Sequence, residues 1–403
     1  MNISLLKHEF AVMSKSKKNV LFIISLTVLL FCYCLLILPN TETPDSFDPK
    51  TLSIDLEELA ATQEAREARG ATGIILMTGQ PHYAMNDFYY NIHKKMITAY
   101  EDNDFKRFIS LRTHYYERDM NNFFNEQIQN ITQSPFPIKD VTHLYNQTLL
   151  RYQGYLNADF PLTYAVVEQK TALQTIHNFL LGPAIFLIMF CAIYFSCDVL
   201  VRDKYNQTVL QGMPISWYRM LNGKTIVAFF YTLVVLSLLL ILGIFILSIQ
   251  FGIGSLEIPV PIKVENWDFT LDEYEVTTIA SFFLNSIIFI PILVYLFIRL
   301  NILLSLFFKN QWLVLMVSTI LLFSEFIYYT RSTRELFGIE ISNLPQTYFQ
   351  FGKVVTGEKN FLVNLETITD SKGILVLLLT IIAIEIVLFA VSRIINKRRF
   401  FSK

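Results

Sequence analysis

The chain has 403 residues, a formal net charge of −1 at pH 7 and an apolar share of 53%. A net charge this close to zero conceals an uneven charge distribution and gives no support to a nucleic-acid partner. The apolar residues are concentrated in long stretches that charged segments separate, which excludes a single soluble core.

Six of these apolar stretches are each about long enough to cross a hydrocarbon core of ~30 Å at ~1.5 Å per residue. The predicted transmembrane helices are residues 20–38, 176–200, 225–251, 276–308, 311–329 and 373–395. The first stretch is too long for a signal peptide, and Pro39 opens a poor cleavage site, so we expect it to be retained. The sequence therefore predicts an all-α polytopic membrane protein with six transmembrane helices.

The positions of Lys and Arg near the ends of these stretches predict their orientation. Basic residues gather in the leader, in the loop after the second span, at the junction after the apolar part of the fourth span (279–298) and in the tail (residues 1–19, residues 201–224, Arg299 with Lys309, and residues 396–403). All of these lie on one side if six spans alternate. The loop 252–275 on the other side holds Lys263 against six acidic residues. We therefore expect both termini in the cytoplasm and the chain in a bacterial plasma membrane.

The segment 39–175 is the one connection large enough to fold by itself outside the membrane. Aromatic residues recur in it at helical spacing and predict a mainly helical extracellular domain, although 71–77 could equally be a short strand. All four cysteines lie inside predicted spans, so no disulfide staples this domain. That pattern favours a Gram-positive envelope. A second, mixed extracellular segment is expected at 330–372.

The leader 1–19 shows apolar residues at helical spacing (Ile3, Leu6, Phe10 and Met13). Glu9 and the other charged residues fall mostly off that face. The spacing predicts an amphipathic interfacial helix at the inner headgroup layer, with a solvated, frayed leader as the alternative.

Nucleotide-binding and catalytic motifs are missing. Gly223-Lys224-Thr225 resembles the end of a phosphate-binding loop, but Tyr218 stands where that loop needs a glycine, and the tripeptide opens an apolar helix. The cytoplasmic loops are also too short for an ATPase domain. The six histidines show no metal-ligand spacing. We therefore expect a chain that is not an enzyme and binds no metal or cofactor directly.

The cytoplasmic loop 201–224 contains a candidate docking element. Pro214 can open a short helix that presents bulky apolar side chains beside a cation (Ile215, Trp217, Tyr218 and Arg219). Such a helix would fit a groove on another protein. An amphipathic connector resting on lipid is the alternative.

At this loop the sequence resembles the ABC-2 family of transporter permeases, whose members show the pattern T-x-x-x-L-x-x-P-I-S-R-x-x-x-L-x-x-K. The matching residues are Pro214, Ile215, Ser216, Arg219, Leu221 and Lys224. The leader and the link 303–315 extend the resemblance. Two departures are that Trp217 stands where Arg is common and that Thr208 lies closer to Pro214 than usual.

The resemblance implies a coupling helix that docks on a separate cytoplasmic ATPase, which holds ATP and Mg. Its residues would be Pro214, Ile215, Ser216, Trp217, Tyr218 and Arg219. The working unit would contain two ATPases and two permease chains, identical or related, which export a cargo through a pathway between them. A hydrophobic or amphipathic peptide, lipid-linked molecule or antibiotic suits the aromatic-rich bundle, and sodium export stays open.

Polar residues inside predicted spans are candidates for the translocation path because charge in a membrane is costly. They are Glu385 at mid-span, Glu325 in an outer third, and Asn285. The structural alternatives are an interhelical hydrogen bond for Glu385 and Asn285, and an interfacial position for Glu325. Asp198 and Arg202 are expected to pair one helical turn apart.

A membrane sensor with 39–175 as its ligand-binding domain is the competing class. A sensor should carry a cytoplasmic output domain, and the sequence offers only short cytoplasmic loops. A membrane-embedded enzyme is a third and weaker reading.

Overall fold

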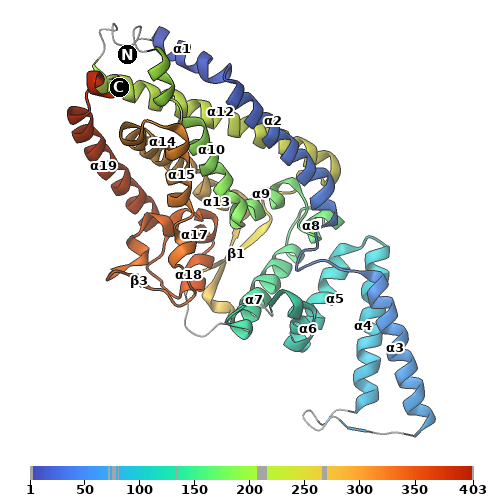
Figure 1. Cartoon of the computed structure of the whole chain (residues 1–403). Coiled ribbons are helices and arrows are strands. Elements are labelled where there is room, and N and C mark those ends of the chain that lie inside the picture. The colour runs from blue at the N-terminus through green and yellow to red at the C-terminus, as the bar shows by residue number, and fades with distance from the viewer. Residues whose placement is uncertain are drawn as a thin grey trace.

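The structure is a computed structural model of the chain, and it describes residues 3–70, 73–74, 79, 81–131, 134–206, 216–265 and 270–401. The described chain is mostly helical. Both termini lie at one end of a bundle of long helices, and the helices α3 (Pro49–Ala68) to α7 (Pro137–Leu156) lie at the other end (Figure 1).

Within the described residues, five helical segments are long and apolar enough to cross a membrane: Lys17–Asn40, Pro183–Asp203, Trp217–Phe251, Ile279–Phe308 and Asp370–Ile394. Their main helices are α2 (Lys17–Cys32), α10 (Phe186–Ser196), α12 (Trp217–Phe251), α13 (Ile279–Ile287) with α14 (Phe289–Phe308), and α19 (Asp370–Ile394). These segments indicate a membrane-embedded protein.

The sixth predicted span, 311–329, differs from the other five. It contains α15 (Gln311–Leu322) of 12 residues and α16 (Glu325–Tyr328) of four. The Ser324 hydroxyl donates to the Leu321 carbonyl at 2.8 Å, which satisfies one of the last carbonyls of α15 where the helix stops. A single helix that crosses a bilayer needs ~20 residues, so six spans remain a prediction.

The helix α12 begins at Trp217, before the predicted start of the third span at residue 225. Its 35 residues correspond to about 50 Å, well over the ~30 Å of a hydrocarbon core. In the sequence Lys224 marks the N-terminal limit of the apolar stretch. In the structure it lies buried, where two carboxylates neutralise it. Residues 217–224 therefore belong to the helix instead of a separate loop.

The segment 39–175 is helical, as expected. It contains α3, α4 (His82–Glu101), α5 (Phe105–Arg118), α6 (Met120–Ile131), α7, α8 (Tyr164–Val167) and α9 (Ala172–Leu181). Phe108, Tyr116 and Tyr152 are fully buried between α5 and α7. The hairpin of α3 and α4 projects away from this core (Figure 1), and α3 has no buried residue. Most of the possible strand 71–77 lies outside the described residues; Ile74 forms an isolated bridge with Pro81.

The predicted second span, 176–200, is not one continuous helix. α9 extends into it and ends at Leu181. Gly182 is extended, with φ −80° and ψ 173°, and Pro183 follows. Proline has no N–H and clashes with the preceding turn, so the helix must restart as a separate element.

The expectation of an all-α fold is wrong in one respect, because two small antiparallel sheets are present. β1 (Pro259–Lys263) pairs with β2 (Tyr274–Thr278), and β3 (Glu335–Leu336) pairs with β4 (Ile339–Glu340). β1 lies close against α7, since a Cβ added at Gly154 would come within 2.6 Å of Pro259. The predicted loop 252–275 therefore contains a buried strand.

The segment 330–372 covers the other side of this hairpin. It contains α17 (Phe351–Val355) and α18 (Glu358–Val363). The amide of Lys263 in β1 donates to the Thr356 carbonyl at 3.0 Å. Gly357 has φ +69°, and a Cβ there would come within 2.0 Å of the Lys263 carbonyl, so only glycine fits without a shift of the backbone.

Candidate functional site

An arginine and a glutamate pair inside the helix bundle. Arg299 in α14 is 1% exposed, and two of its nitrogens donate to the two carboxylate oxygens of Glu385 in α19. Its third nitrogen donates to the Thr225 hydroxyl of α12 at 2.8 Å. Burying a charge among apolar helices is costly unless it is paired, and this bidentate pair meets that condition.

Two tyrosines complete the set of hydrogen bonds to the same carboxylate. Tyr295 of α14 donates to one Glu385 oxygen at 2.8 Å, and Tyr218 in the first turn of α12 donates to the other at 3.0 Å. We call Arg299, Glu385, Tyr295, Tyr218 and Thr225 the central network. Because four donors already occupy the carboxylate, Glu385 can accept a cargo group only after one of them leaves. In this conformation it joins three helices.

A second buried cluster lies near the chain termini. The Lys224 ammonium donates to Glu9 at 3.0 Å and contacts Asp203 at 2.9 Å. It also donates to the Val199 carbonyl at 3.3 Å, and Glu9 in turn contacts Arg202 at 3.5 Å. We call Glu9, Arg202, Asp203 and Lys224 the stem clamp. It fixes both ends of the predicted loop 201–224, which we call the docking loop, to one helix, α1 (Ile3–Ser14).

The expected pair of Asp198 with Arg202 does not form through their side chains. Lys18 contacts Asp198 at 3.0 Å, and Arg202 contacts Glu9. The two residues still lie one turn apart, since the Arg202 amide donates to the Asp198 carbonyl at 2.8 Å, but each side chain pairs with a residue of the N-terminal helices instead.

The leader helix forms as the spacing predicts, but its surroundings differ. Glu9, expected off the apolar face, is 8% exposed at the contact with α12. Met13 beside it is fully buried, and the ring of Phe10 packs edge-on against Tyr231 at 5.6 Å. The helix α1 therefore packs against protein on the face that carries Glu9. The periodicity of the sequence does not reveal the cations that pair with Glu9 there.

The predicted coupling residues are divided among different surroundings. Pro214 and Ile215 lie outside the described residues. Ser216 precedes the first turn of α12, and Arg219 is exposed. Trp217 is 8% exposed, and its ring lies 5.4 Å from that of Phe400. Tyr218 belongs to the central network. Of the expected apolar side chains, Trp217 is thus buried and Tyr218 is hydrogen-bonded within the bundle, and the docking of this element stays a prediction.

The other path candidates, Glu325 and Asn285, do not join the central network. Glu325 contacts Lys359 at 2.6 Å, and both side chains are almost fully buried near the outer helices. Asn285 is exposed on α13. The structure thus separates the three candidates instead of gathering them along one path.

A third polar cluster lies where α7 meets the hairpin and the segment 330–372. Two nitrogens of Arg331 donate to the two carboxylate oxygens of Asp140, each at 2.8 Å. His143 shares a 2.6 Å hydrogen bond with Tyr274 and stacks on Phe361 at 3.8 Å. Sequence reasoning missed this junction, since its members are separated by more than a hundred residues. Burial, and then the nearby charge of Lys263, lowers the pKa of His143 to about 3.

We expect His143 to make the stability of the helices in the segment 39–175 depend on pH. In the unfolded chain its pKa is ~6.5, so acid favours the unfolded state. The contribution of the neutral His143 side chain to the free energy of unfolding is complete above about pH 6.5, and it is lost as the pH falls toward the folded pKa of about 3. Between pH 7 and pH 5 the free energy of unfolding should fall by roughly 2 kcal/mol less in His143→Gln than in the native chain, as measured by chemical unfolding. His114→Gln, at an exposed position, is the control; equal slopes in both variants would contradict a buried neutral imidazole.

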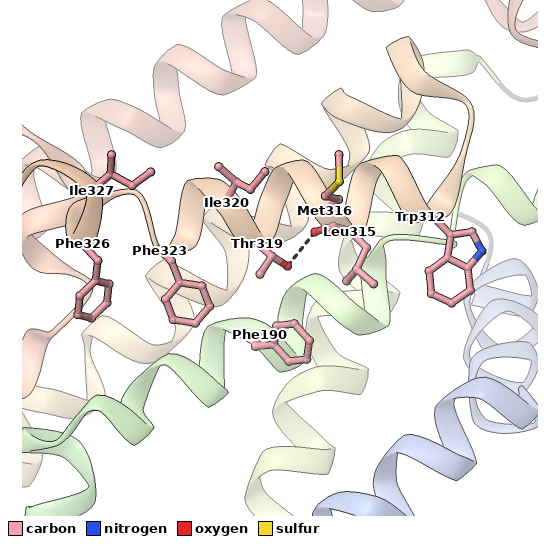
Figure 2. Close-up of a pocket in the computed structure, with 9 residues that line it drawn as sticks. All are labelled: Phe190, Trp312, Leu315, Met316, Thr319, Ile320, Phe323, Phe326 and Ile327. Atoms are coloured by element: carbon pink, nitrogen blue, oxygen red, sulfur yellow. Dashed lines mark hydrogen bonds between the residues drawn. The ribbon is translucent and has the colours of Figure 1, made fainter.

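An apolar groove of about 670 Å³ runs along the outer face of α15 (Figure 2). Phe190 of α10 lies opposite Leu315 and Phe323, whose side chains point toward it, whereas Met316 points away. Its one hydroxyl, on Thr319, donates to the Leu315 carbonyl at 2.8 Å. The lining is therefore almost entirely apolar, with the Trp312 indole N–H as its other side-chain donor, as expected of a surface that packs against lipid or another helix.

Within the described ranges, no three His, Cys, Asp or Glu side chains are grouped so that they could hold a metal ion. Comparison of the chain with protein-family models, curated proteins and solved structures found no match.

Proposed function

We propose that this chain is the permease subunit of an ATP-driven exporter in a bacterial plasma membrane. In this proposal six helices span the bilayer, both termini are cytoplasmic, and a separate ABC-type ATPase binds at the end that carries the termini. The observation that carries the proposal is that the stem clamp and the central network meet in the first turns of α12. Lys224 of the stem clamp is followed directly by Thr225 of the central network, and Tyr218 lies at the start of the same helix.

The first part of this connection is the stem clamp. Lys224 links α12 to Asp203 on the far side of the docking loop, and Glu9 links both sides to α1. A force on the loop therefore acts on α1, α10 and α12 together. Rigid-body movement of packed helices is a common way to convert docking into conformational change.

The second part is Tyr218. It lies next to Trp217 in the first turn of α12, yet its hydroxyl bonds to Glu385 in α19. Glu385 is bound in turn to Arg299 and Tyr295 in α14. A partner that tilts the start of α12 would pull on this carboxylate and change how α12, α14 and α19 meet. This arrangement supports a permease whose helices move when a partner acts at one end.

The partner would supply ATP hydrolysis, with ATP and Mg bound to it. A second permease chain, identical or related, would complete the pathway. We propose a hydrophobic or amphipathic cargo, such as a peptide, a lipid-linked molecule or an antibiotic, because the helix bundle is rich in aromatic residues.

A membrane sensor is the second candidate, and one observation favours it. The α3–α4 hairpin extends away from the outer core (Figure 1), and no residue of α3 is buried, so its surface is free for an external ligand. The adjacent gene discriminates between the two classes: an ATPase with nucleotide-binding motifs favours the exporter, and a kinase favours the sensor.

The test of the proposed function is co-purification of this chain from its native membrane with an ABC-type ATPase, which the proposal expects an adjacent gene to encode. We expect a stable complex, and we expect Trp217→Ala with Arg219→Ala to lower its cargo-stimulated ATP hydrolysis by roughly tenfold, because Trp and Arg dominate docking energies. Membrane insertion should be unchanged.

The control for this test is Trp312→Ala with Arg393→Ala, which truncates the same residue types at exposed positions outside the predicted coupling element. Because Trp217 is buried, Arg219→Glu serves as a second variant that leaves the packing intact. Full coupling in both test variants would contradict the assigned role of this element.

A further inference from the structure

The C-terminal helix lies against the start of α12. The chain leaves α19 at Ile394, turns, and forms the one-turn helix α20 (Lys397–Phe401). The Arg399 amide donates to the Asn396 side chain at 3.0 Å, which caps the beginning of α20. Both termini share this end of the bundle (Figure 1).

The contact between α20 and α12 is made by two aromatic rings. Phe400 is fully buried, and its ring lies 5.4 Å from that of Trp217 at an angle of 39°. Lys309, at the end of α14, donates to the Arg399 carbonyl at 3.3 Å and places its ammonium 5.9 Å from the centre of the Phe400 ring. The helix α20 is thus held at Trp217 and at Lys309.

A helix of one turn has no stability of its own in water, so its packing against the rest of the chain decides whether α20 stays in place. Segments at a chain end open more readily than the centre of a protein core. Opening of α20 would expose the Trp217 ring while Tyr218 and the central network keep their hydrogen bonds.

We propose that α20 is a reversible cover over the docking surface at Trp217. Phe400 occupies the face of Trp217 that a partner protein would contact, so the partner binds only when α20 lifts. This inference rests on the proposed function, in which Trp217 contacts an ATPase, and adds an autoinhibitory contact to it. Lys309 sets how firmly the cover closes.

The cover itself can be tested without a partner. In the full chain with Trp267→Phe and Trp312→Phe, Trp217 is the remaining tryptophan, and acrylamide quenching reports its exposure. Phe400→Ala should raise the quenching constant roughly threefold, because the ring that shields Trp217 is gone. Phe307→Ala, at an exposed aromatic position near the same end, should leave it unchanged. Equal quenching in both variants would overturn the cover.

The regulatory role is tested by binding of the ABC-type ATPase encoded beside this chain to the full chain in nanodiscs. Phe400→Ala should bind roughly three- to tenfold tighter than the native chain, because the competent state no longer has to be opened. Lys309→Ala loosens the cover without removing an aromatic ring, so it should shift affinity the same way if Phe400→Ala fails to fold.

The outcomes of the binding test separate the two proposals. Equal or weaker binding by both variants would overturn the cover and make α20 part of the docking surface. Failure of the native chain and of both variants to bind would instead refute the proposed function, and the cover with it.

Discussion

Replacing Lys224 by methionine is expected to destabilise the folded chain by about 3–5 kcal/mol. The substitution keeps the apolar stem of the side chain and removes its charge. Glu9 and Asp203, both nearly buried, would then face each other, and Arg202, 3.5 Å from Glu9, would be the remaining cation of the stem clamp. One cation cannot compensate two buried carboxylates, so the loss exceeds that of a single ion pair. The midpoint of thermal unfolding in detergent measures the effect.

A matched rescue distinguishes this charge effect from a loss of packing. Lys224→Met combined with Glu9→Gln and Asp203→Asn removes the cation and both anions together, and should recover most of the lost stability. Lys7→Met removes an exposed lysine from the same leader helix and should have little effect. A triple variant as unstable as Lys224→Met alone would contradict the stem clamp as an electrostatic unit.

Arg299→Met is the second substitution with a large expected effect, again about 3–5 kcal/mol. It leaves the Glu385 carboxylate with two tyrosine donors inside an apolar bundle. Arg299→Met with Glu385→Leu should be much more stable than Arg299→Met, because no charge is left unpaired. Thermal unfolding of both variants in detergent checks the prediction, and an unchanged midpoint for Arg299→Met would contradict the pairing.

Glu385→Gln separates the structural role of the central network from a role in transport. The amide keeps the size of the side chain, but only its oxygen can accept, so one of the two tyrosines loses its acceptor and the buried Arg299 loses its counter-charge. The stability loss should therefore be comparable to that of Arg299→Met. Reduced transport by a well-folded Glu385→Gln variant would support a role in the moving parts. Normal transport with normal stability would leave Glu385 as an interhelical link only.

The apolar stretches of the sequence were sufficient to predict the long helices. Each such helix satisfies its own backbone N–H and C=O groups, so its formation depends on local composition and length alone. The same reasoning fails for 311–329, where the apolar composition continues through the break between α15 and α16. It also misses β1, because Pro259 and Pro261 argue against a strand in a single sequence.

The partners of the charged residues were much harder to predict. Glu385 stood out because it is a carboxylate in an apolar stretch, but Arg299 was assigned to the junction after the fourth span. In the structure it lies inside α14, 86 positions from Glu385 in the sequence. Glu9 and Lys224 are 215 positions apart. Periodicity reports which face a residue occupies on its own helix, whereas these pairs depend on how separate helices meet.

The central claim is that the end carrying the start of α12 faces the cytoplasm, where an ATPase can reach it. Single cysteines test it directly in a chain whose four native cysteines are replaced by serine. Arg219→Cys and Tyr83→Cys, both at exposed positions, are treated with a membrane-impermeant maleimide. We expect intact cells to label Tyr83→Cys alone, and Arg219→Cys to react only after permeabilisation. Labelling of Arg219→Cys in intact cells would contradict the account.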